Sequence, residues 1–111
     1  MMENIDKTSA EILSRNFEVE ISYTDDANFK LFKLALMQRI ADLIKSDFEK
    51  LLWILYRIDV DEKAVTDILS DKQNLKPAEA IANLIIQRQI QKAETRLKYK
   101  QRDEEGPTGD Y

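Results

Sequence analysis

The residues that could carry chemistry in this chain are acids and bases, because none of the 111 residues is His or Cys. This composition leaves out the usual general base near neutral pH, the usual nucleophile–base pairs and the common zinc ligand sets. The only glycines, Gly106 and Gly109, come within the last six residues, which excludes a glycine-rich phosphate loop. We therefore expect no catalytic residue, no bound metal and no cofactor.

The densest acidic cluster outside the C-terminal segment is Asp59, Asp61 and Glu62. Carboxylate oxygens are the ligands that hard cations prefer. The calcium-loop pattern fails, however, because Lys63 and Ala64 stand where that loop needs an oxygen ligand and a glycine. Acids before a helix also cap its N–H groups and complement its dipole. We favour helix capping, by Asp61 alone or by Asp59 with Glu62.

A basic segment lies near the C-terminus, where residues 87–102 hold six bases and one acid. Three interpretations stay open: a nucleic-acid surface, a solvated helix face, and pairing with residues 1–27, which hold seven acids and two bases. The net charge of −4 opposes general affinity for nucleic acid, so this function is the alternative rather than the first choice. The predicted basic face consists of Arg88, Lys92, Arg96, Lys98, Lys100 and Arg102.

A helix with two apolar stripes is predicted over residues 28–45. One stripe suffices to attach a surface helix to a small domain, so the second indicates either a central helix or a subunit contact. The first stripe is Phe29, Phe32, Leu36, Ile40 and Leu43, and the second is Leu34, Met37, Ala41 and Ile44. We expect a homodimer whose subunit contact contains Phe29, Leu34, Met37, Ala41 and Ile44.

Apolar and polar residues alternate over 17–23, which is typical of a half-buried strand. A lone strand cannot satisfy its own backbone, so this segment either pairs with another chain or is coil or helix. A short helix is predicted to begin near Thr8, and another over 47–57 after a capping box of Ser46 with Glu49. A third begins after the acidic cluster and ends near Leu69, and the last covers 77–100, starting at Pro77. The helix over 47–57 should be the most buried, with Trp53 and Tyr56 in the core.

These elements predict a mainly α fold, a bundle of three to four helices with one short N-terminal strand as an open alternative. We expect a partly extended segment over 1–27, a helical domain over 28–100 and a disordered acidic tail over 101–111. The longest apolar run, residues 51–56, is too short to span a membrane. No secretory signal is visible and cysteine is missing, so a cytoplasmic location is expected.

Two phrases of the sequence, residues 52–62 and 84–92, resemble a family of small, all-helical, uncharacterised bacterial proteins. The resemblance covers residues 46–100, about half of the chain, and residues 56–62 are its most specific part. It implies a helical domain of bacterial origin, and it implies no activity, cofactor or catalytic residue. The expected function is therefore that of a non-enzymatic intracellular protein-interaction module with itself or an unknown protein as partner.

Overall fold

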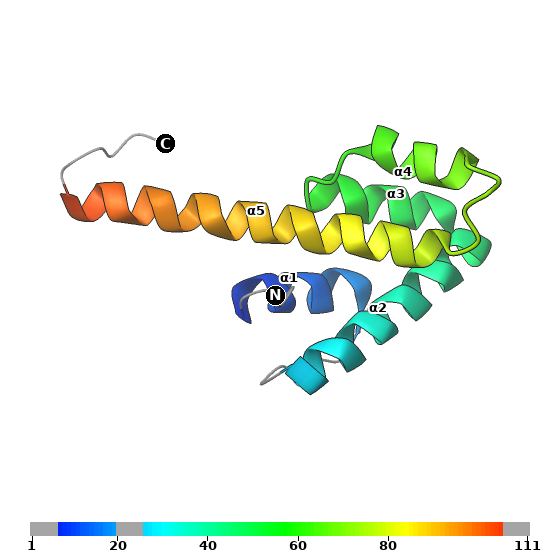
Figure 1. Ribbon diagram of the computed structural model, residues 1–111, viewed down its shortest axis with the longest axis horizontal. Helices are drawn as coiled ribbons and strands as arrows, with labels where there is room; N and C mark the ends of the chain where they lie inside the picture. The colour runs from blue at the N-terminus through cyan, green and yellow to red at the C-terminus, as the bar shows by residue number, and fades with distance from the viewer. Residues whose placement is uncertain (1–6, 20–25, 106–111) are drawn as a thin grey trace.

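The computed structural model describes residues 7–19 and 26–105, and these residues form five α-helices and no β-strand (Figure 1). The predicted mainly α class is confirmed, whereas the described part of the chain holds five helices rather than the predicted three to four. The helices are α1 (Lys7–Phe17), α2 (Asp26–Ser46), α3 (Phe48–Arg57), α4 (Glu62–Ser70) and α5 (Pro77–Glu105).

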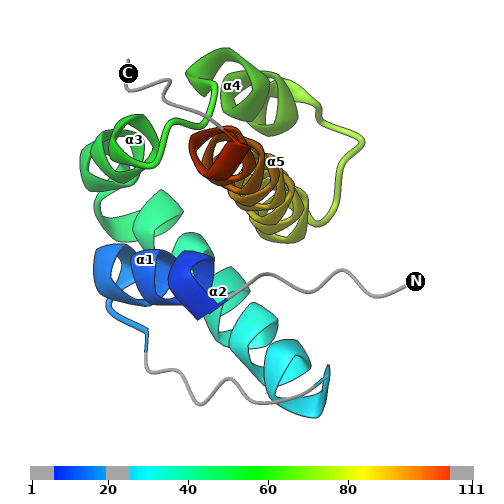
Figure 2. The same cartoon turned by 90° about the vertical axis from the view of Figure 1, so that its left-hand side faces the viewer.

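The long helix α5 is the axis around which the others pack. It contacts α1, α2 and α4, while α3 joins the bundle through α2 and α4. Viewed along α5, helices α3 and α4 lie on one side of it and α1 and α2 on the other (Figure 2). The first half of α5 is enclosed by these helices, and its second half extends beyond them (Figure 1). The bundle and the extension together span 50 Å.

The core is built from one apolar stripe of each helix. Every residue of the first predicted stripe of α2 is at most 6% exposed, which confirms that this face points inward. The α1 residues Ala10, Leu13 and Phe17 are fully buried in the same core, so α1 belongs to one domain with α2–α5. The other helices complete the core with Leu51, Ile54 and Leu55 from α3, Val65 from α4, and Ile81, Ala82, Ile85 and Ile86 from α5.

Helix α3 differs from the prediction, because its aromatic side chains face outward. Trp53 is 56% exposed and Tyr56 is 82% exposed, so the expectation that both lie in the core is wrong. The guanidinium carbon of Arg57 lies 4.8 Å from the centroid of the Trp53 ring, which covers part of that ring with a cation. A ten-residue helix packed against the bundle on one side buries only one stripe, however apolar its other faces are.

Helix α1 ends at Phe17, and the next residue, Glu18, has a φ of 58°, which lies in the left-handed region. The Val19 N–H donates to the Ser14 carbonyl at 3.0 Å, which is the closing bond of a Schellman motif. The predicted strand over 17–23 is therefore wrong at its beginning, because Phe17 is helical and Glu18 turns the chain. Residues 20–23 lie outside the described residues.

The end of α3 repeats this arrangement at Asp59, whose φ is 64°. The Val60 N–H donates to the Leu55 carbonyl at 2.9 Å, and the Asp59 N–H donates to the Tyr56 carbonyl at 3.2 Å. The flanking residues Ile58 and Val60 are buried, as are Phe17 and Val19 at the end of α1. Alternating apolar and acidic residues thus mark two helix ends in this chain.

An arginine from a helix distant in the sequence donates hydrogen bonds to each of these turns. Arg39 of α2 donates through Nε to the Phe17 carbonyl at 3.0 Å and through Nη2 to the Glu18 carboxylate at 2.8 Å. Arg88 of α5 donates through Nε to the Asp59 carbonyl at 2.8 Å and through Nη2 to its carboxylate at 2.6 Å. Glycine usually occupies such left-handed positions. Here the arginine contacts offset the steric cost of a side chain.

An aspartate caps the N-terminus of α3 and another caps the N-terminus of α4. Asp47 caps α3 by accepting from the Lys50 N–H at 3.2 Å, and the Ser46 hydroxyl instead donates to the Asp42 carbonyl at 2.7 Å. The predicted capping box of Ser46 is therefore wrong by one residue. Asp61 caps α4 by accepting from the Lys63 N–H at 3.0 Å, which confirms the capping role of the acidic cluster.

We expect Asp59→Ala to lower the Tm more than Asp59→Gly does. Both variants lose the carboxylate contact with Arg88, but only alanine must also place a Cβ in the left-handed region. Thermal melts followed by circular dichroism measure the difference. Asp59→Asn is the matched control, since it tolerates this backbone and lacks the charge. Equal Tm values for the alanine and glycine variants would show that the turn imposes no such cost.

Candidate protein-interaction groove

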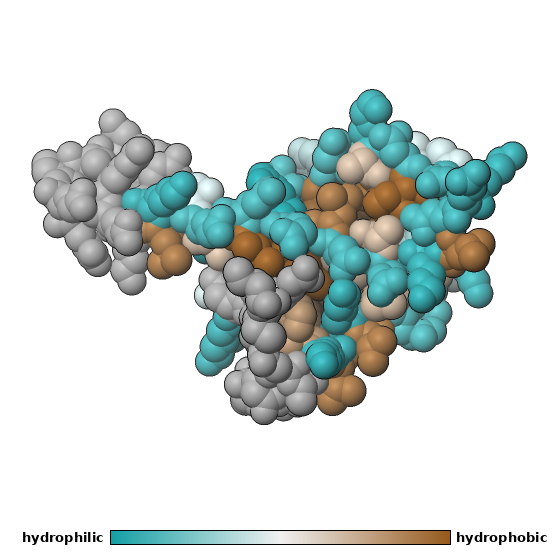
Figure 3. Space-filling model, viewed as in Figure 1, coloured by the Kyte–Doolittle hydropathy of each residue, from teal (hydrophilic) through white to brown (hydrophobic). Residues whose placement is uncertain are grey.

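An open groove of about 430 Å³ lies between α2 and the start of α5. Figure 3 shows hydrophobic side chains reaching the surface along α2, below α5. Apolar groups dominate the lining, and the ionisable groups that line it are two lysines and one glutamate. The lining residues are Leu34, Met37, Gln38, Ala41, Ile44 and Lys45 from α2, and Leu75, Lys76, Pro77, Ala78 and Glu79 from the segment that opens α5.

The α2 wall of the groove is the second predicted stripe. Leu34, Met37, Ala41 and Ile44 follow one another at helical spacing, so they form a single row of side chains. Leu34 is 59% exposed, and the other three are partly buried. Four of the five residues predicted for the subunit contact therefore line one groove.

Phe29, the fifth predicted contact residue, does not belong to this wall. It is 6% exposed and packs in the core with Phe32 and Leu36. Its spacing from these residues already placed it on the first stripe, so its assignment to a subunit contact was inconsistent with the helical period. Phe29 is a core residue, and the groove does not contain it.

The opposite wall was not predicted, because its residues come from a loop without periodicity. Leu75 is 88% exposed and forms one lip of the groove, opposite the α2 stripe. An apolar residue between polar residues and Pro77 was the one signal in the sequence that could have identified it. A large apolar side chain with so high an exposed fraction usually marks a contact surface when it lies beside other exposed apolar groups.

Side chains of the α4–α5 loop fix the shape of this wall. The Asp71 carboxylate accepts from the Gln73 N–H at 3.0 Å, and the Asn74 side chain accepts from the Lys76 N–H at 2.9 Å. The Asn74 N–H also donates to the Asp71 carbonyl at 3.0 Å. Such turns hold a short loop in one conformation without regular secondary structure. Leu75 is thus presented by a loop whose backbone is hydrogen-bonded on both sides.

Charged residues surround the end of the groove where α5 begins. Lys45 and Lys76 line this end and are exposed, with Glu79 one turn further into α5. The groove therefore combines an apolar floor with a lysine-bearing rim, and such a surface can bind an apolar segment with acidic ends.

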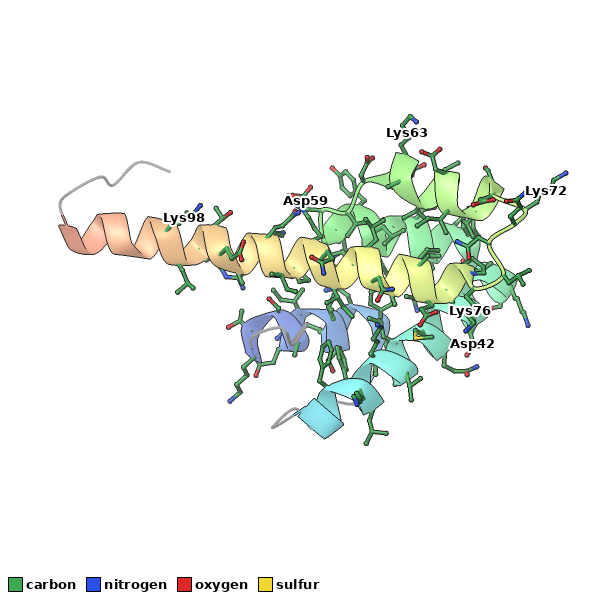
Figure 4. The ribbon with its side chains drawn as sticks, viewed as in Figure 1. Asp42, Asp59, Lys63, Lys72, Lys76 and Lys98 are labelled. Carbon is green, nitrogen blue, oxygen red and sulfur yellow. The ribbon has the colours of Figure 1, made fainter. Side chains whose placement is uncertain are left out.

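The described residues of the predicted basic face make different contacts. Arg88 points to the α3–α4 connection and is bonded to Asp59, whereas the Arg96 Nη2 donates to the Ser9 hydroxyl of α1 at 3.3 Å. Helix α1 and that connection lie on opposite sides of α5 (Figure 2). Lys98 is exposed on the projecting half of α5 (Figure 4). Lys92 is half-buried, and the side chains of Lys100 and Arg102 lie outside the described part of the molecule.

The two carboxylates of the helix-end turns have altered pKa values. Hydrogen bonding to Arg88, then the charges of Arg88 and Lys92, lowers the pKa of Asp59 below its ordinary 3.8. A hydrogen bond from Lys50, then the charges of Lys50 and Arg39, lowers the pKa of Glu18 below its ordinary 4.5. Both groups are solvent-exposed, so salt will weaken these interactions.

Among the residues that the structure describes, no three or more acidic side chains lie close enough together to hold a metal ion.

We expect the free energy of unfolding to fall as the pH drops below about 4.5, the ordinary pKa of Glu18. The lowered pKa values mean that the unfolded chain takes up protons at a higher pH than the folded one, so acid favours unfolding. The stabilising contribution is complete above the ordinary pKa values and disappears as the pH falls through the folded-state values. Urea titrations from pH 7 to pH 2.5 measure this loss.

The matched variant for this test is Arg88→Gln, which removes the cation beside Asp59. Its acid-induced loss of stability should be smaller than that of the wild type, because the largest cause of the lowered pKa of Asp59 is removed. Acid profiles of identical slope in the two proteins would contradict the assignment to this ion pair.

No helix within residues 7–19 and 26–105 has the length and hydrophobicity that a membrane span requires.

The comparisons with known proteins give no relative for this chain. The resemblance of residues 46–100 to small helical bacterial proteins stays a prediction. The chain matches no protein-family model, and neither the curated proteins nor the solved structures contain a match to it.

Proposed function

We propose that this chain is a non-enzymatic, intracellular protein-interaction module that forms a homodimer through the groove between α2 and α5. The observation that carries the proposal is the groove itself, a wall of four regularly spaced α2 side chains facing the exposed Leu75. Its charged groups lie at one end and Gln38 is the one uncharged polar side chain of the α2 wall, so burial of apolar surface is the main interaction that this site can offer.

A second copy is the partner that we favour. In a two-fold contact each copy supplies one groove and fills the other, so the buried apolar surface is doubled. The eleven residues that line one groove are fewer than a standard protein–protein interface uses on each side, and a contact that engages both grooves brings the number closer to that range. Leu34 and Leu75, 59% and 88% exposed in the single chain, would then be covered.

Leu34→Glu should convert the homodimer into a folded monomer, because it places a carboxylate in the apolar groove. Size-exclusion chromatography with light scattering should give 13.0 kDa for the variant and twice that mass for the wild type. The free energy of unfolding of the monomer should change by only about 0.5 kcal/mol, since the side chain is exposed.

Leu31→Glu is the matched control, because Leu31 is similarly exposed at 64%, lies on the same helix and does not line the groove. This variant should stay dimeric. Unfolding of the Leu34→Glu protein would instead identify the second stripe as internal core. A wild-type mass of 13.0 kDa at every concentration would reject the homodimer.

The alternative function is that of a nucleic-acid-associated protein using the basic residues of α5. What supports it is the projecting half of α5, where Lys98 is exposed and further bases follow in the sequence. The engagement of Arg88 and Arg96 in contacts within the chain weighs against it, because fewer cations are left to meet phosphates.

We expect no mobility shift of DNA or RNA by the wild type at 50 mM salt, since the chain is acidic overall. If a shift is seen, Lys92→Glu/Lys98→Glu should abolish it on the alternative function and leave the fold intact. These two lysines are preferable to Arg96, whose contact with Ser9 helps to hold α1. A shift that weakens as salt rises would support the alternative over the interaction module.

A further inference from the structure

Helix α3 exposes three aromatic side chains at the surface of the bundle. Viewed along α5, this helix lies at the edge of the molecule (Figure 2). Its inner stripe is buried, whereas Phe48 is 37%, Trp53 is 56% and Tyr56 is 82% exposed. None of these three side chains lines the groove between α2 and α5. They therefore belong to a second surface, separate from the proposed homodimer contact.

The side chains of this surface follow one another at helical spacing. Phe48, Leu52 and Tyr56 are four residues apart, so they form one ridge along α3, with Leu52 half-buried between the aromatic rings. Trp53 and Arg57 form a second ridge beside it, and the guanidinium over the indole helps to hold the ring in place. We call these five residues the aromatic face. Tryptophan, tyrosine and arginine are the residue types that contribute most to binding in protein interfaces.

The polar groups of the aromatic face are hydrogen-bond donors. The Trp53 indole and the Arg57 guanidinium can only donate, and the Tyr56 hydroxyl can donate as well as accept. Among the residues that the structure describes, none accepts a hydrogen bond from any of these three groups. The one acidic side chain of α3 is Glu49, a turn before Trp53. A ligand that fits this face must therefore bring apolar surface together with carbonyl groups that lack donors of their own.

Proline-rich segments have this combination of groups. Proline has no N–H, and a polyproline II helix makes no internal hydrogen bonds, so its carbonyls depend on donors from outside. A partner helix satisfies its own carbonyls, and a β-strand brings N–H groups for which this face has no row of acceptors. The ridge from Phe48 to Tyr56 is about 12 Å long, which corresponds to about four residues of a polyproline II helix.

We infer that the aromatic face of α3 binds a proline-rich segment of a partner protein in the polyproline II conformation. Its prolyl rings pack against Trp53 and Tyr56, and its carbonyls accept hydrogen bonds from the donors of the face. Single-stranded nucleic acid fits less well, because Arg57 is the single cation of the face and Glu49 on the same helix offsets its charge. The inference goes beyond the proposed homodimer and does not depend on it.

The test is a fluorescence titration of the full-length chain, in which Trp53 is the only tryptophan and so reports on this surface alone. An acetylated and amidated octaproline peptide should shift the Trp53 emission to shorter wavelength until the signal saturates. A glycine–serine peptide of equal length should give no shift, because it is flexible and presents no apolar rings. Tyr56→Ala should weaken octaproline binding about fivefold or more. Its Tm should equal that of the wild type, since Tyr56 is 82% exposed.

Leu31→Ala is the matched control, because Leu31 is 64% exposed on α2, outside the aromatic face, and this variant should bind octaproline as the wild type does. Tyr56→Phe keeps the ring and loses the donor, so its affinity should lie between those of the wild type and Tyr56→Ala. The inference is overturned if octaproline gives no saturable shift or if both peptides shift the emission equally. A shift on dilution of the chain alone would assign the face to a second copy instead. A shift with an oligothymidine strand and none with octaproline would assign it to nucleic acid.

Discussion

The packing of α2 against α5 is the contact on which the remaining structure depends. It brings the first stripe of α2 onto the buried isoleucines of α5, and the other three helices attach to this pair. Because α2 carries a second apolar stripe, the same crossing leaves a row of side chains beside the start of α5. The core and the groove are therefore two sides of one helix, and a change that tilts α2 would alter both.

The ends of the shorter helices are fixed by charge rather than by glycine. Arg39 and Arg88 each reach across the bundle to a carboxylate and a carbonyl at a left-handed turn. These contacts tie α1 to α2 and the α3–α4 connection to α5, so they position helices as well as stabilising turns. Arg88 illustrates the consequence for function, because the cation that looked available for phosphate serves the fold instead.

Helical periodicity made much of the fold predictable. The two stripes of α2, the start of α5 at Pro77 and the cap at Asp61 are all local patterns, and the structure confirms each of them. Four of the five groove residues on α2 followed from the same period. The prediction failed where tertiary contacts decide the outcome. Trp53 and Tyr56 are apolar in type, yet no helix covers their face in the described bundle.

The alternating pattern at Phe17–Val19 shows a second reason for failure. Alternation is the mark of a strand when neighbouring strands satisfy the backbone, but here a bond from Val19 to Ser14 closes a helix instead. The similar residues at 58–60 form the same turn, so comparing the two segments could have exposed the error. Helical periodicity could not predict the role of Leu75, because this residue lies in a loop and its role depends on the α2 stripe that the loop faces.

The use of Glu18 and Asp59 at left-handed turns also affects the denatured chain. Glycine would relieve the folded backbone at these positions, but it would give the unfolded polypeptide more conformations to lose on folding. From Met1 to Glu105 this chain contains no glycine at all. Its disordered ensemble is accordingly narrower than that of a glycine-containing chain of equal length, and the entropy opposed to folding is smaller. A domain of this size benefits from an unfolded chain with fewer accessible conformations.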